Sequence, residues 1–177
     1  MEGRTGPPDA LVHCAGTTGS APLGGYPDEL WNRIVSVNLH GTFHIVRAVF
    51  GGMCERGFGR IVLFSSDSAT RPIAGQAAYA ATKAGIEALA KVIAVEGGPH
   101  GVTCNVVAPG ITDTPMTRRH WTRQEMDEVV ADSPIANVQR TVVEAQDVAD
   151  AATFFCTPGS GRITGQVLHV NGGALMP

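Results

Sequence analysis

Short apolar runs bounded by Gly or Pro alternate in this chain with longer stretches of mixed apolar and polar residues. Four of the runs have the length and composition of buried strands, at residues 10–13, 60–64, 103–107 and 166–170. Strands of a parallel sheet are nearly continuous apolar segments because helices cover both of their faces. The alternation therefore predicts an α/β domain whose parallel sheet lies between helices. In such sheets, functional groups collect beyond the carboxyl ends of the strands.

Two long helices are predicted between these strands. The first begins at Pro27, which is followed by Asp28 and Glu29, and it ends near Arg56. Its apolar positions are Leu30, Ile34, Val37, Ile45, Val49 and Met53. Such a helix is about 45 Å long, which is more than one domain usually covers, so we expect it to support a partner subunit as well. The second helix contains Tyr79 and ends near Glu96.

Composition excludes several classes of protein. The 177 residues suit one domain, and the net charge of −3 gives no reason to expect a nucleic acid or an anionic membrane as a partner. The apolar runs are too short to span a bilayer, and the first residues lack the apolar core of a signal peptide. We therefore expect a cytoplasmic protein. The four cysteines match no zinc-ligand spacing and the histidines are scattered, so we expect reduced thiols and no metal site.

Tyr79 and Lys83 are four residues apart on the second helix, so their side chains leave the same face, one turn apart. At an effective dielectric of about 20, a cation about 4 Å away would lower the pKa of a phenol by roughly three units. Tyr79 could then exchange protons near neutral pH. The same spacing also occurs by chance in many helices, so the rest of the chain must decide between the two interpretations.

Several motifs together resemble the short-chain dehydrogenase/reductase family, in particular its short single-domain members such as the 3-oxoacyl-carrier-protein reductases. The resemblance covers nearly all of the chain. Ser66 precedes Tyr79 by 13 residues, as the catalytic serine of the family precedes its tyrosine. The other matching stretches are Asn38 within V-N-L-H-G, residues 13–16, residues 105–114 and residues 163–173. His13 and Cys14 depart from the asparagine pair that begins the family's N-N-A-G segment.

The resemblance implies a catalytic role for four residues. Tyr79 would give a proton to the reduced carbonyl oxygen, or take one from an alcohol in the reverse direction. Lys83 would keep the tyrosine acidic and bind the ribose of the nicotinamide nucleotide. Ser66 would donate a hydrogen bond to the substrate oxygen, and Asn38 would hold a water that relays protons to Lys83.

The resemblance also implies that NAD or NADP is the cofactor. Cys14, Ala15, Gly16, Pro109, Gly110, Tyr79 and Lys83 would line its site, with Thr112 through its backbone and Thr114 through its hydroxyl orienting the carboxamide. In the family, the choice between the two coenzymes depends on residues after the second strand, which have no counterpart in these 177 residues. The chain therefore leaves that choice open.

The implied fold is the C-terminal part of a Rossmann-like doubly wound parallel sheet, without the family's first three strands. The family's strand order of 3-2-1-4-5-6-7 would place residues 10–13 in an edge strand. The T-G-x-x-x-G-x-G turn that holds the coenzyme pyrophosphate does not occur among these residues. We therefore expect residues 1–177 to form a single, incomplete catalytic domain, that is, a fragment.

Three functions remain open at this point. The first is the catalytic part of a dehydrogenase. The second is a shortened, non-catalytic family member that acts as a binding or assembly subunit. The third is a chain with residual nucleotide binding alone.

The substrate is expected to be a small molecule, and residues 114–134 correspond to the family's variable lid. Arg118, Arg119 and Arg123 lie there beside Trp121 and could meet the phosphates of a coenzyme A or carrier-protein thioester. The more ordinary interpretation is a solvated helix face. The residues around Ser66 and the P-G-I-T-D-T stretch are similar to family members that act on alicyclic hydroxyacyl thioesters. A simple cyclic or secondary alcohol is the alternative substrate.

A homo-oligomer, either a tetramer or a dimer, is also expected. The long helix at Pro27 and the C-terminal strand resemble subunit contacts of the family. The outer face of the second helix is a further candidate contact surface, because it is rich in alanine, at Ala77, Ala80, Ala84 and Ala88. Small side chains permit close helix approach, although Ala is also simply a good helix former.

Overall fold

A parallel sheet of four strands organises the computed structural model, which describes residues 6–176. The strand order is β1-β2-β3-β6. The strands are β1 (Ala10–His13), β2 (Gly59–Phe64), β3 (Val102–Pro109) and β6 (Val167–Val170). All pairs are parallel, with Val12 opposite Val62 and Val107 opposite Leu168. The predicted strands and parallel sheet are therefore confirmed, with β1 at an edge as expected.

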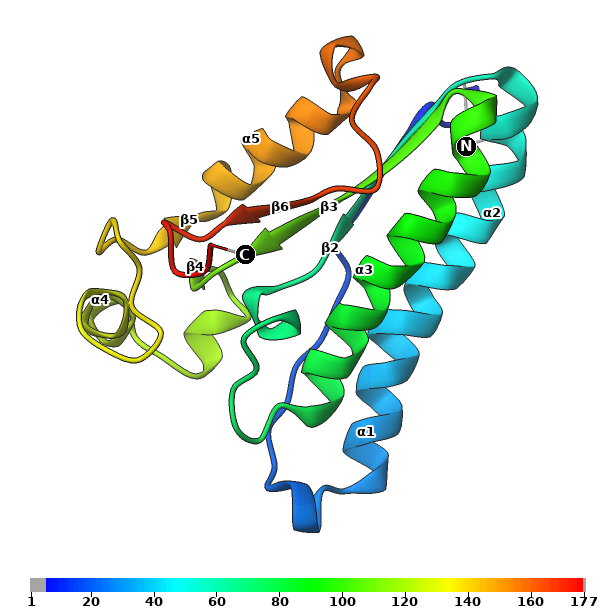
Figure 1. Cartoon of the computed structure of the whole chain (residues 1–177). Helices are drawn as coiled ribbons and strands as arrows, with labels where there is room; N and C mark the ends of the chain where they lie inside the picture. Colours follow the sequence, from blue (N-terminus) through cyan, green and yellow to red (C-terminus); the bar gives the residue numbers. More distant parts are fainter. Residues whose placement is uncertain (1–5, 177) are drawn as a thin grey trace.

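Helices cover both faces of the sheet, as predicted (Figure 1). On one side α2 (Gly41–Arg56) and α3 (Ala77–Gly97) lie next to each other, and on the other side lies α5 (Ala145–Cys156). Successive side chains of β2 point to opposite faces of the sheet and so contact different helices. Ile61 and Leu63 pack with α2 and α3, whereas Val62 packs with α5. Both faces of β2 are thus buried, which explains its continuous apolar sequence.

The first helix is not one regular α-helix. It starts at Asp28, directly after Pro27, and α1 (Asp28–Val35) is joined to α2 by a π-helical turn at Ser36–His40. Such a wider turn changes the direction of the side chains that follow it. Asn38 lies in this turn and is fully buried. The apolar pattern predicted the extent of the helix correctly but did not reveal the turn.

The segment beyond the ends of the strands forms a small layer of its own. It contains α4 (Arg123–Ala131) and the two-residue strands β4 (Thr112–Asp113) and β5 (Val143–Glu144), which pair in parallel. Met126 and Val130 of α4 are buried in a cluster with Val142. This layer covers the carboxyl ends of the main strands. Within residues 6–176, no helix combines the length and the apolar character needed to cross a membrane.

Candidate active site

The carboxyl ends of the main strands border a cavity of about 1010 Å³. Nearly every residue that the sequence singled out lies on its wall. These residues are Cys14, Gly16, Ser66, Tyr79, Lys83, Pro109, Gly110, Thr112 and Thr114. Two other predicted residues do not line the cavity. Ala15 is exposed, and Asn38 is fully buried behind the wall. The structure thus brings nine of the eleven predicted site residues together at one site.

Lys83 is held at the base of this wall. Its Nζ donates a hydrogen bond of 2.8 Å to the carbonyl oxygen of Phe64, the last residue of β2. It also lies 5.5 Å from the centroid of the Tyr79 ring, one helical turn away on α3. The residue is 6% exposed, and this burial lowers the pKa of Lys83 to about 8. The ammonium is therefore still charged at neutral pH but easily neutralised above it.

The expected effect of Lys83 on Tyr79 is wrong for this structure. Burial raises the pKa of Tyr79 above its ordinary value, and a hydrogen bond with Ser66 acts in the opposite direction. The ammonium bonds to the Phe64 carbonyl and faces the Tyr79 ring, so it does not offset the cost of burying a phenolate. The phenol consequently keeps its proton near neutral pH, which suits a proton donor.

Ser66 is fixed by a short 3-10 turn, Asp67–Ala69, that directly follows it. Its Oγ accepts a hydrogen bond of 3.2 Å from the backbone N–H of Ser68 and caps that turn. Its neighbour Ser65 has a different role, since the Ser65 Oγ lies 2.6 Å from Glu87 Oε1 and 3.2 Å from the Lys83 carbonyl oxygen. Ser65 therefore fastens the loop to α3.

Asn38 connects the loop after β1 to the helices. Its Oδ1 accepts a hydrogen bond of 2.8 Å from Thr17 N–H, and its Nδ2 donates to the Thr17 carbonyl oxygen and to Thr82 Oγ1. A Cβ placed on Gly16 would lie 3.5 Å from Asn38 Oδ1 and 3.7 Å from Lys83 Nζ. Asn38 thus supports the wall behind Lys83. The water relay expected of it stays a prediction.

The residues at this wall fit the ribose and nicotinamide portion of a dinucleotide. A Cβ on Gly16 would be in van der Waals contact with Lys83 Nζ, 3.7 Å away, so the glycine leaves the space next to this ammonium free of a side chain. Lys83 uses one N–H on Phe64, and no other protein partner of its Nζ is found in residues 6–176. Thr112 is buried and donates to the Gly110 carbonyl oxygen, whereas the Thr114 hydroxyl lies 3.0 Å from that of Thr117. Both threonines therefore belong to a rigid turn at the rim.

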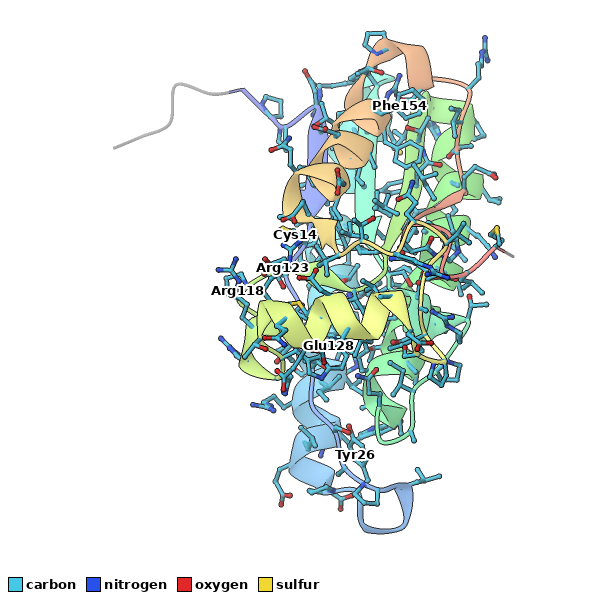
Figure 2. The ribbon with its side chains drawn as sticks, turned by 90° about the vertical axis from the view of Figure 1, so that its left-hand side faces the viewer. Cys14, Tyr26, Arg118, Arg123, Glu128 and Phe154 are labelled. Atoms are coloured by element: carbon cyan, nitrogen blue, oxygen red, sulfur yellow. The ribbon has the colours of Figure 1, made fainter. Side chains whose placement is uncertain are left out.

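The structure distinguishes between the two interpretations of the lid arginines. Arg118 donates to Asp113 at 2.6 Å and 3.1 Å, and Arg123 bonds to Asp113, Asp127 and Glu144 at 3.1, 3.2 and 2.7 Å. Figure 2 shows both at the start of α4. Hydrogen bonds from Arg118 hold the pKa of Asp113 below its usual range. Two of the three arginines thus pair with carboxylates and are exposed, which favours the solvated helix face over a cluster that meets substrate phosphates.

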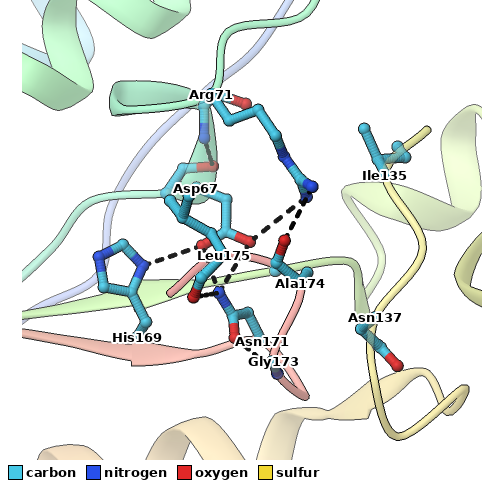
Figure 3. A network of polar contacts seen from close by, with 12 residues as sticks. Asp67, Arg71, Ile135, Asn137, His169, Asn171, Gly173, Ala174 and Leu175 are labelled. Carbon is cyan, nitrogen blue, oxygen red and sulfur yellow. Dashed lines mark hydrogen bonds and ion pairs between the residues drawn. The ribbon is translucent and has the colours of Figure 1, made fainter. Parts of the chain in front are cut away.

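One polar cluster next to Ser66 was missed at the sequence level (Figure 3). It joins Asp67 to His169, Asn171 and Arg71, although Asp67 and Asn171 are 104 residues apart. A buried aspartate directly after Ser66 was visible in the sequence as S-S-D. No pattern in the chain indicates which distant residues would bind it.

Comparisons with known proteins agree with this geometry. The sequence matches, over residues 1–174, a family profile described as enoyl-(acyl carrier protein) reductase. It is 38% identical over 174 residues to an acetoacetyl-CoA reductase of Allochromatium vinosum, covering 98% of this chain and 68% of that protein. It is also 39% identical to the 3-oxoacyl-[acyl-carrier-protein] reductase FabG of Escherichia coli, covering 95% of this chain and 67% of FabG.

Two solved structures share the fold. An oxidoreductase of the short-chain dehydrogenase/reductase family from Burkholderia thailandensis superposes with a TM-score of 0.84 at 35% identity, over 96% of this chain and 65% of that one. A 3-oxoacyl-[acyl-carrier protein] reductase from Brucella melitensis gives a TM-score of 0.85 at 33% identity, over 96% and 63%. The chain spans about two thirds of the length of these relatives.

Proposed function

This chain belongs to the short-chain dehydrogenase/reductase family, and from that premise we propose that it is an NAD(P)-dependent oxidoreductase that interconverts a secondary alcohol and a ketone. The main support is the position of Ser66, Tyr79 and Lys83 on one wall of the large cavity. As substrate we propose a 3-oxoacyl thioester or an alicyclic acyl thioester. The names of the relatives, which include acetoacetyl-CoA reductase, favour a thioester.

Tyr79 acts as the acid in the direction of reduction. Its raised pKa keeps the phenol protonated, so it can donate a proton to the carbonyl oxygen as negative charge develops there. Ser66 lines the same cavity wall, donates to the same oxygen and stabilises that charge. The two hydroxyls therefore define where the ketone oxygen binds.

Lys83 would hold the coenzyme, which is the second reactant. Its ammonium lies in front of the space left by Gly16 and would bind the ribose hydroxyls of the coenzyme. When bound, a nicotinamide coenzyme supplies the hydride that reduces the carbonyl carbon.

A spectrophotometric panel tests this function. NADH and NADPH oxidation is followed with 3-oxoacyl thioesters and, separately, with cyclic ketones. We expect oxidation of one coenzyme with a thioester, and faster turnover than with simple cyclic ketones. Equal inactivity on every thioester would remove the proposed substrate class. If NAD(P)H fluorescence is also unchanged by the protein, the enzymatic function fails and a non-catalytic binding or assembly role replaces it.

We also propose that the protein self-associates through the outer face of its helical layer. Large apolar side chains are exposed there, namely Val37, Phe43 and Ile45 before and within α2, and Val92 and Val95 on α3. Between these helices lies a hollow of about 460 Å³ lined by Leu39, His40, Phe43, His44 and Leu89. A second copy that presented the same face would bury both sets of side chains in a symmetric contact.

A further inference from the structure

We propose that Asp67 is a positioning residue for Ser66, which it holds in place by binding the loop after β2 to the loop after β6. The proposal rests on the function proposed above, because it concerns how the Ser66 hydroxyl is kept at the substrate oxygen. Asp67 is the residue that follows Ser66, and it begins the 3-10 turn that the Ser66 side chain caps. Its effect on the reaction is therefore exerted through Ser66.

The Asp67 carboxylate has a partner on each side (Figure 3). Its Oδ1 lies 3.0 Å from His169 Nδ1 and accepts a hydrogen bond of 3.0 Å from Asn171 Nδ2. Its Oδ2 is 3.1 Å from the same Nδ2 and 4.0 Å from the guanidinium of Arg71. The residue is 7% exposed, and a buried carboxylate needs such donors to offset the loss of water. The cluster is therefore a specific attachment and not a solvated surface pair.

Three strand ends meet at this carboxylate. The loop after β2 contributes Asp67 itself, β6 contributes His169, and Asn171 comes directly after β6. The turn after β3 lies against the cluster as well, since a Cβ on Gly110 would be 2.8 Å from Asn171 Cβ and 3.4 Å from Asp67 Oδ2. The position of Asp67 is thus fixed relative to three of the four strands of the sheet.

Hydrogen bonds to backbone groups continue the cluster into both loops. The Asp67 carbonyl oxygen accepts hydrogen bonds from the N–H groups of Thr70 and Arg71, and the Ser66 carbonyl oxygen accepts one from Ala69. On the other loop, Asn171 Nδ2 donates to the Leu175 carbonyl oxygen, and Arg71 Nη1 donates to that of Ala174. Loss of the carboxylate would therefore release both loops together, and Ser66 with them.

Hydrogen exchange of individual amides tests the attachment without relying on turnover. We compare the wild type with Asp67→Ala, with Asp67→Asn, and with Asp150→Ala, which removes an exposed aspartate of α5. In Asp67→Ala we expect the amides of Ser68–Arg71 and of Gly173 and Ala174 to exchange about tenfold faster or more. A rise of this size corresponds to the loss of about one buried hydrogen bond. Asp67→Asn keeps an acceptor for His169 or Asn171 and should show a smaller rise. Asp150→Ala should leave both loops unchanged.

Steady-state kinetics give the second readout. We expect Asp67→Ala to lower kcat about tenfold or more while KM for the coenzyme stays within about twofold, with partial recovery in Asp67→Asn. Unchanged exchange in both loops, or a wild-type kcat in Asp67→Ala, would overturn the proposal. If the wild type itself has no activity while exchange rises in both loops, the attachment by Asp67 stands and the proposed oxidoreductase function fails.

Discussion

Lys83 donates its hydrogen bond to the carbonyl oxygen of Phe64, 19 residues earlier in the chain and at the very end of β2. The bond fixes a buried ammonium at the point where the strand opens into the Ser66 loop. Burial lowers the pKa of Lys83 from 10.5 to about 8, so the charge is present at neutral pH at a cost to the folded state. Function and stability are therefore opposed at this residue.

Replacing this lysine should stabilise the protein. Between pH 8 and 10.5 the unfolded chain binds a proton at Lys83 that the folded chain does not, so wild-type stability should rise with pH across that window. The full shift corresponds to about 3 kcal/mol, part of which the Phe64 hydrogen bond offsets. We expect Lys83→Met to raise the free energy of unfolding at pH 7 by about 1–3 kcal/mol and to lose the rise above pH 8.

Urea unfolding at several pH values measures this effect. Lys91→Met is the matched control, because Lys91 is the chain's other lysine and is exposed on the same helix. It should change neither the stability at pH 7 nor its pH dependence. A Lys83→Met variant that is less stable than the wild type at pH 7 would contradict the assignment of a costly buried ammonium.

Asn38 should be essential for stability as well as for the site. It is fully buried, and its side chain makes the three hydrogen bonds to Thr17 and Thr82. Asn38→Ala would leave the N–H and C=O of Thr17 without these partners, so we expect a loss of about 2–4 kcal/mol in thermal or urea unfolding. Asn32→Ala, on the exposed side of α1, should cost far less. Equal losses in the two variants would show that the Asn38 contacts do not stabilise the fold.

The proposed self-association depends on the apolar face of α2 and α3. Phe43 is 44% exposed on that face, and Phe43→Glu would place a charge in the contact between two copies. We expect sedimentation analysis to show a larger assembly for the wild type and a smaller one for Phe43→Glu. Leu23→Glu changes a side chain that is 79% exposed in the turn before α1 and should keep the wild-type assembly. A monomeric wild type would rule out the contact.

The sequence predicted those parts of the fold that depend on local pattern. β2 and β3 are continuous apolar runs because both faces are buried, and Tyr79 and Lys83 share a helix face because of their spacing. The T-x-x-E capping box at Thr122 and Glu125 was also present as a signal for the start of α4, but the prediction named a helix face in the lid without giving its bounds. Its helix could therefore have been found.

Other features depend on contacts that no local pattern contains. The π-helical turn at Ser36–His40 interrupts a stretch whose apolar spacing continues on both sides. The pairing of Arg123 with Glu144 requires β4 and β5 to lie together, and Asp67 meets His169 across 102 residues. The direction of the Tyr79 pKa shift depended likewise on how deeply the fold buries the phenol.

Comparison of Tyr79→Phe with the wild type tests the central claim most directly. The measurement is the rate of NAD(P)H oxidation with a 3-oxoacyl thioester, together with a fluorescence titration of the coenzyme. Tyr26→Phe is the control, since Tyr26 is the chain's other tyrosine and its buried hydroxyl has no hydrogen-bond partner within residues 6–176.

Removing the proton donor should lower kcat in Tyr79→Phe by about 10²- to 10⁴-fold with coenzyme binding retained, and Tyr26→Phe should turn over like the wild type. Turnover by Tyr79→Phe at the wild-type rate would contradict the account.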